Sequence, residues 1–123
     1  MTVQHSFSKL EKELLPAFRQ QIATAESTED VKKNFVYITR DLLDKATGGE
    51  LKPRYEDIRL VPAAEDESSK FDFSGRIMDN PAFIAVWRNS DLQHIVGRFA
   101  ASASNRYRHL EKNPEKTEAK IRM

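Results

Sequence analysis

The segment 28–49, TEDVKKNFVYITRDLLDKATGG, carries the clearest helical pattern of the chain. Its first turn is acidic, where the helix dipole favours negative charge, and Ser27 precedes that turn as an N-cap. Gly48 and Gly49 follow and supply the left-handed conformation that ends many helices. The pattern predicts a helix over 28–47, whose apolar face consists of Val31, Phe35, Ile38, Leu42 and Ala46.

The residues before this segment predict another helix, over 8–25. Ser8 and Glu11 match the S-x-x-E capping box, in which the two side chains satisfy backbone N–H groups of the first turn. Pro16 lies inside the helix and removes one of its hydrogen bonds, so we expect a kink or a division near Leu15. The apolar stripe of this helix recurs every four residues, at Leu10, Leu14, Phe18 and Ile22.

The C-terminal part predicts a short helix and a long one. Asn80 followed by Pro81 is typical of a helix start, and the helix over 81–88 is apolar on nearly all sides. The sequence Ser-Asp-Leu-Gln at 90–93 matches a second capping box and predicts that a helix over 91–111 begins there.

The segment 50–79 differs from the rest because Pro53, Pro62, the acidic run 65–67 and the serine pair at 68–69 interrupt any helical pattern. Two stretches, 55–61 and 70–77, have the alternation that strands show. Two interpretations stay open: a small β-hairpin with an acidic tip, or an irregular segment laid across the helices.

The length of 123 residues suits one domain, and 39% hydrophobic residues are enough for one core. We therefore predict a mainly α fold, a compact bundle of three to four helices over 1–112 with a middle segment that forms a small hairpin or stays irregular. Residues 113–123 are expected to be a flexible polar tail.

The chain has few of the residues that common catalytic chemistry needs. It contains no cysteine and four glycines, which excludes thiolate metal sites, thiol nucleophiles and a Gly-rich phosphate loop. The three histidines, His5, His94 and His109, are far apart, and neither H-E-x-x-H nor G-x-S-x-G is present. We assign no catalytic residue, no metal ligand and no cofactor.

Positive charge is concentrated near the C-terminus, although 20 basic and 19 acidic residues nearly cancel overall. The helix over 91–111 places its cations opposite its apolar face, and no acidic residue lies between Asp91 and Glu111. This stripe is either a solvated helix face or a surface for an anionic partner. Its polar members are His94, Arg98, Asn105, Arg108, His109 and Lys112.

Three further residues have two interpretations each. Arg106 falls beside the apolar face, which predicts a salt bridge to the acidic middle segment or, alternatively, a recognition arginine. Trp87 and Phe83 are one turn apart and belong either to the core or to an interface. The same two interpretations apply to Phe71 and Phe73.

These observations favour a non-enzymatic protein-binding module, such as a small regulator, adaptor, inhibitor or subunit of a complex. The alternative is a nucleic-acid-binding accessory protein that uses the stripe, and a third hypothesis is a small enzyme with an unrecognised site. We expect another protein as the partner, no membrane association, and a cytoplasmic location, because the chain has neither a signal-like start nor a long apolar run. The residues expected to contact a partner are Phe83, Trp87, His94, Arg98, Asn105, Arg106 and Arg108.

Overall fold

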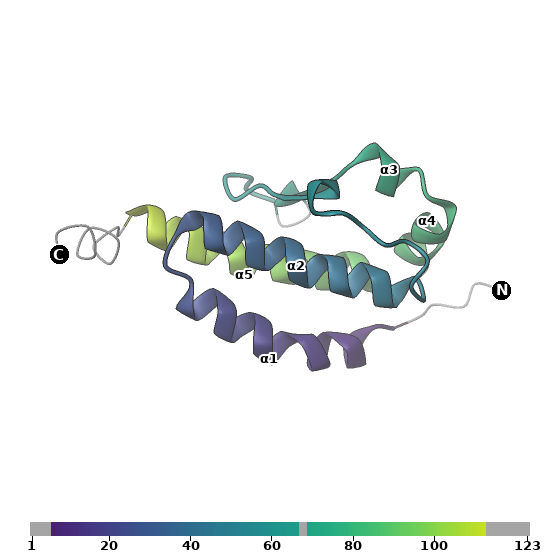
Figure 1. The fold of residues 1–123 in the computed structure, drawn as a ribbon, viewed down its shortest axis with the longest axis horizontal. Coiled ribbons are helices and arrows are strands. Elements are labelled where there is room, and N and C mark those ends of the chain that lie inside the picture. The colour runs from purple at the N-terminus through teal and green to yellow at the C-terminus, as the bar shows by residue number, and fades with distance from the viewer. Residues whose placement is uncertain (1–5, 67–68, 113–123) are drawn as a thin grey trace.

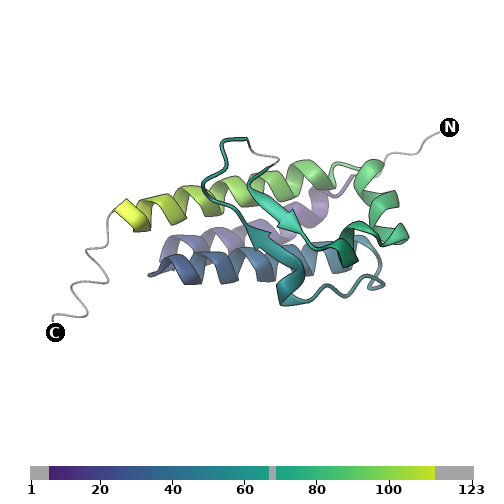
Figure 2. The same ribbon diagram turned by 90° about the horizontal axis from the view of Figure 1, so that it is seen from above.

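Three long helices frame the protein in the computed structural model, which describes residues 6–66 and 69–112. They are α1 (Ser8–Thr24), α2 (Thr28–Ala46) and α5 (Leu92–Lys112). Figures 1 and 2 show α2 and α5 side by side and antiparallel, with α1 lying along one side of this pair. The mainly α fold class is confirmed, and the predicted tail falls outside the described residues.

The opposite side of the helix pair carries the segment that the sequence left open, and it contains a β-hairpin (Figure 2). The 3₁₀ helix η1 (Tyr55–Asp57) leads into β1 (Ile58–Leu60), which pairs antiparallel with β2 (Phe71–Phe73). Two short helices follow, α3 (Gly75–Met78) and α4 (Pro81–Arg88). Of these elements, η1 and α3 were not expected from the sequence, whereas α4 has the predicted bounds.

Local capping signals explain where several helices begin and end. The Ser27 hydroxyl accepts a hydrogen bond from the backbone N–H of Asp30 at 3.1 Å, and the Asn80 side chain accepts one from Phe83 at 3.1 Å. Gly48 and Gly49 have φ angles of 67° and 84°, a conformation that other residues adopt at a cost. These predictions are therefore confirmed.

The two predicted capping boxes are wrong. Ser8 is already helical, and the start of α1 is held instead by Asp91, whose Oδ1 accepts the backbone N–H of Phe7 at 2.8 Å. Gln93 donates its side-chain amide to the carbonyl of Trp87 at 3.2 Å, which joins α5 to α4. At Ser8 a partner distant in sequence replaces the local one. At Ser90 the hydroxyl still accepts the backbone N–H of Leu92 at 3.2 Å, so only the reciprocal bond expected from Gln93 is lost.

Of the kink or division expected near Leu15, the division is wrong, because α1 continues through Pro16. Proline has no N–H to donate to the carbonyl group one turn earlier in the helix. Pro16 is exposed, so that carbonyl group lies near solvent.

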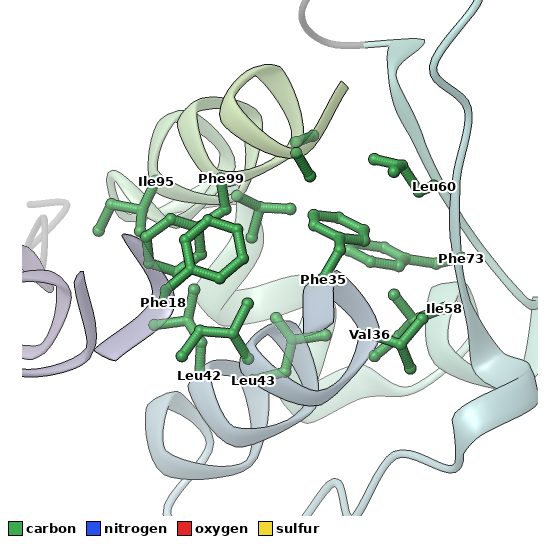
Figure 3. Packing of buried hydrophobic residues seen from close by; sticks show 14 of the residues in the cluster. Phe18, Phe35, Val36, Leu42, Leu43, Ile58, Leu60, Phe73, Ile95 and Phe99 are labelled. Atoms are coloured by element: carbon green, nitrogen blue, oxygen red, sulfur yellow. The ribbon is translucent and has the colours of Figure 1, made fainter. Parts of the chain in front are cut away.

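The core lies between the three long helices and extends under the hairpin (Figure 3). Phe18 of α1 and Phe99 of α5 touch with ring centroids 5.0 Å apart, and Phe35 of α2 is fully buried beside them. The inner residues of the hairpin, Ile58 and Phe73 among them, close this core on the right-hand side of Figure 3. The apolar stripes predicted for the three long helices thus meet in one core.

Candidate functional site

A pocket of about 390 Å³ lies where β2, α3, α4 and the first turns of α5 meet. Its apolar wall consists of Phe71 and Phe73 from β2, Met78 from the end of α3 and Trp87 from α4. Met78 is 42% exposed, which is high for a side chain of this size and polarity. We call this cavity the aromatic pocket.

Trp87 organises the aromatic wall. Its ring meets Phe71 edge to face at 5.9 Å and Phe73 at 5.4 Å, both favourable geometries for aromatic pairs. Phe83 stacks on the Trp87 ring at 5.1 Å and is itself fully buried, so it supports Trp87 from within the core. Trp87, which is partly exposed, is therefore placed at the pocket, whereas Phe83 is not at the surface.

The opposite wall comes from α5. Gln93, His94 and Gly97 line the pocket. They lie on one side of the helix because Gln93 and Gly97 are four residues apart and His94 follows Gln93 directly. Gln93 and His94 are exposed and bring polar side chains to the rim. Gly97 is buried in the second turn of α5, at a position inside a helix where glycine usually costs stability.

Two of the residues that line the pocket are acidic. Asp66 and Asp72 belong to its lining, and no Lys or Arg is found among the described residues that line it. Asp72 also forms a cross-strand ion pair with Arg59, with Oδ2 3.1 Å from the guanidinium and both side chains mostly exposed. Exposed pairs of this kind are weak, so Asp72 still presents negative charge to a neighbour.

The arginines of α5 that were expected to contact a partner bind other segments of this chain. Arg98 makes a two-pronged ion pair with Glu11 of α1, with both N···O distances 2.8 Å. Arg106 donates to the carbonyl of Ala25 at 2.8 Å, at the turn between α1 and α2. The salt bridge expected between Arg106 and the acidic middle segment is therefore absent from the described hydrogen bonds and ion pairs.

Arg108 instead reaches the middle segment, donating from two nitrogens to the carbonyl of Pro62 at 3.3 and 3.0 Å. Asn105 is exposed, on the same side of α5 as His94. The structure thus brings Trp87 and His94 together at one pocket and distributes Arg98, Arg106 and Arg108 among contacts with three other segments.

Asp57 fixes the position of the hairpin relative to α3. Its carboxylate, 5% exposed, accepts hydrogen bonds from the backbone N–H of Arg54 (2.8 Å), the Ser74 hydroxyl (2.7 Å) and Arg76 (2.7 and 3.1 Å). Burial by itself raises the pKa of Asp57, but the hydrogen bonds from Arg76, Arg54 and Ser74 and the charge of Arg76 outweigh burial and lower the pKa to about 2. The sequence analysis did not single out this residue.

A second hollow, of about 310 Å³, lies beside the C-terminal half of α2. Its lining includes Tyr37, which is 52% exposed and meets Tyr55 edge to face at 5.8 Å. Charged side chains of both signs, Arg40, Asp41, Asp44 and Lys52, make up most of the rest. This hollow is more open to water and less apolar than the aromatic pocket, so it is the weaker candidate.

Two other kinds of site were sought in the described ranges, 6–66 and 69–112. Within them no cluster of three or more His, Asp or Glu side chains is arranged to hold a metal ion. None of the helices there combines the length and apolar character needed to cross a membrane.

Several pocket residues were missed by the sequence analysis or assigned no site. The period of two that places Phe71 and Phe73 on one face of β2 was visible, and it is the signal that could have found them. Nothing in the sequence indicates that Met78, Gln93 and Gly97 lie beside them, because they come from other elements.

Comparison of the chain with protein-family models, with curated proteins and with solved structures gives no match.

Proposed function

We propose that this protein is a non-enzymatic module that binds another protein, and that the aromatic pocket is its contact site. The observation that carries the proposal is a partly exposed tryptophan in a cavity of about 390 Å³, backed by a buried aromatic ring. Tryptophan anchors of this kind, held rigid and surrounded by apolar wall, dominate the binding energy of protein interfaces. An exposed methionine beside it adds an adaptable apolar surface.

The alternative, a nucleic-acid-binding accessory protein, is supported less well by the geometry. Phosphate contact needs cations that face outward, and Arg98, Arg106 and Arg108 each donate to an oxygen of another segment of this chain. The two proposals differ in salt dependence: binding through phosphates weakens steeply as salt rises, and binding through an apolar pocket changes little.

Site-specific photocrosslinking tests the proposal. His94, exposed at the rim, is replaced by p-benzoylphenylalanine in the full chain, and the matched control carries the same group at Asn105, exposed on the same helix outside the pocket lining. We expect irradiation in cells of the source organism to give a discrete protein adduct from position 94 and none from position 105. Equal adducts at both positions, or adducts only with nucleic acid, would contradict the proposal.

A further inference from the structure

The hairpin has an open edge beside the aromatic pocket. In antiparallel pairs, residues alternate between those that exchange hydrogen bonds and those whose backbone groups point outward. The backbone N–H of Ser74 donates to the backbone carbonyl of Asp57 at 2.9 Å, and the backbone N–H of Val61 donates to the backbone carbonyl of Lys70 at 2.6 Å. With the observed register, these bonds make Arg59 and Asp72 the hydrogen-bonded pair between them.

The N–H and C=O groups of Phe71 and Phe73 therefore point away from β1. None of the hydrogen bonds found among the described residues joins these groups to another element. Among the described residues, β1 is the only element with which β2 makes extensive backbone contact. The outer edge of β2 thus presents backbone donors and acceptors next to a cavity lined by its own phenylalanine rings.

We propose that an extended segment of the partner protein adds to this edge as a third strand and inserts apolar side chains into the aromatic pocket. Strand addition is a recurring way to bind peptides, in which main-chain hydrogen bonds give affinity and pockets for alternate side chains give specificity. This inference rests on the proposed function and specifies its ligand.

Asp72 determines which segment fits. It is the central residue of β2, and its side chain lies on the opposite face from Phe71 and Phe73. Residues paired across an edge point to the same face, so the partner places apolar side chains opposite the two phenylalanines and one intervening side chain opposite Asp72. Because that neighbour is negative, the complementary pattern is apolar, then Lys or Arg, then apolar.

The same residue disfavours a second copy of this chain as the occupant. Two β2 edges paired antiparallel about their centres would set Asp72 opposite Asp72, and like charges at that position are destabilising. Edge charges of this kind are a common means by which proteins avoid pairing with themselves.

The test begins with nine-residue linear peptides displayed on phage and selected on the full chain. We expect enrichment of the pattern apolar–Lys/Arg–apolar. An enriched peptide is then synthesised with Lys or Glu at the centre, and its affinity is measured by fluorescence anisotropy. The Lys peptide should bind about fivefold more tightly, the size expected when an attractive cross-strand pair becomes repulsive.

A charge exchange on the protein provides the matched variant. Arg59→Glu/Asp72→Lys keeps an ion pair across the hairpin but reverses the charge that β2 presents, so the preference should change to the Glu peptide. Glu50→Lys repeats the acidic-to-basic change made at position 72, but at an exposed position outside the pocket, and should retain the preference for Lys.

Methylation of the peptide backbone separates strand pairing from side-chain binding alone. In the bound peptide, the N–H groups of alternate residues face β2. N-methyl groups at those residues should reduce affinity at least about tenfold, and N-methyl groups at the other residues should change affinity little. Amide hydrogen exchange followed by NMR should slow at Phe71 and Phe73 when the peptide binds.

Failure of the selection to enrich any sequence, equal binding of all methylated peptides, or exchange at Phe71 and Phe73 that the peptide leaves unchanged would overturn strand addition. Faster sedimentation of the protein alone at high concentration, together with amide exchange at Phe71 and Phe73 that slows as the protein concentration rises without peptide, would assign the edge to a second copy instead. The photocrosslink at position 94 tests protein binding without any assumption of strand pairing, so the two proposals fail separately.

Discussion

Replacing Asp57 by asparagine should remove most of the stability that this carboxylate contributes, and the loss should depend on pH. The side chain keeps its shape, but the negative charge that Arg76 contacts at 2.7 Å disappears. The asparagine side chain also has one acceptor oxygen, whereas the carboxylate uses both of its oxygens to bind Arg54, Ser74 and Arg76.

The magnitude follows from the pKa. Folding lowers the pKa of Asp57 from 3.8 to about 2, and each unit corresponds to about 1.4 kcal/mol of differential stabilisation of the charged form. The ionised carboxylate thus contributes about 2 kcal/mol at pH 7. Because the pKa is depressed by folding, this contribution is present above pH 4 and is lost as the pH falls from about 4 to about 2.

Urea denaturation of the wild type and Asp57→Asn, from pH 7 to pH 2, measures the effect directly. The difference in unfolding free energy should be about 2 kcal/mol at pH 7 and should approach zero near pH 2, where the wild-type carboxyl is protonated as well. Asp79→Asn, at an exposed position at the end of α3, is the control and should show almost no difference at any pH. A difference for Asp57→Asn that stays constant or grows as the pH falls would refute this account of the site.

Three other predictions concern the helical layer. Phe99→Ala should lower the unfolding free energy by about 3–5 kcal/mol, measured by urea denaturation, because the ring is 1% exposed and contacts Phe18. Thr39→Val should leave stability unchanged or raise it by about 1 kcal/mol in a thermal melt, since the buried Thr39 hydroxyl has no partner among the described residues. Arg98→Glu should lower the unfolding free energy by about 1 kcal/mol, because it places two negative side chains together. The charge exchange Glu11→Arg/Arg98→Glu should recover most of that stability. An equal loss of stability in the exchange variant would show that the ion pair is not the cause.

Short-range patterns in the sequence determined most of the helical elements of this protein. The helix over 28–47 was predicted to within a residue, because its start depends on Ser27, its end on Gly48 and Gly49, and its face on a period of 3.6. The start of α4 at Asn80 and Pro81 was predicted for the same reason. These signals act within a few residues of the chain, so no knowledge of the packing is needed to interpret them.

Only the tertiary structure decided what the charged and aromatic side chains do. Arg98 pairs with Glu11 across 87 residues of sequence, and this pairing makes one arginine of the predicted stripe a link between two helices. The pocket likewise requires Trp87 and Phe71, from a helix and a strand, to meet at one end of α5. These contacts depend on which helix faces pack together and on how the hairpin packs over them. Neither can be predicted from the spacing of residues along the chain.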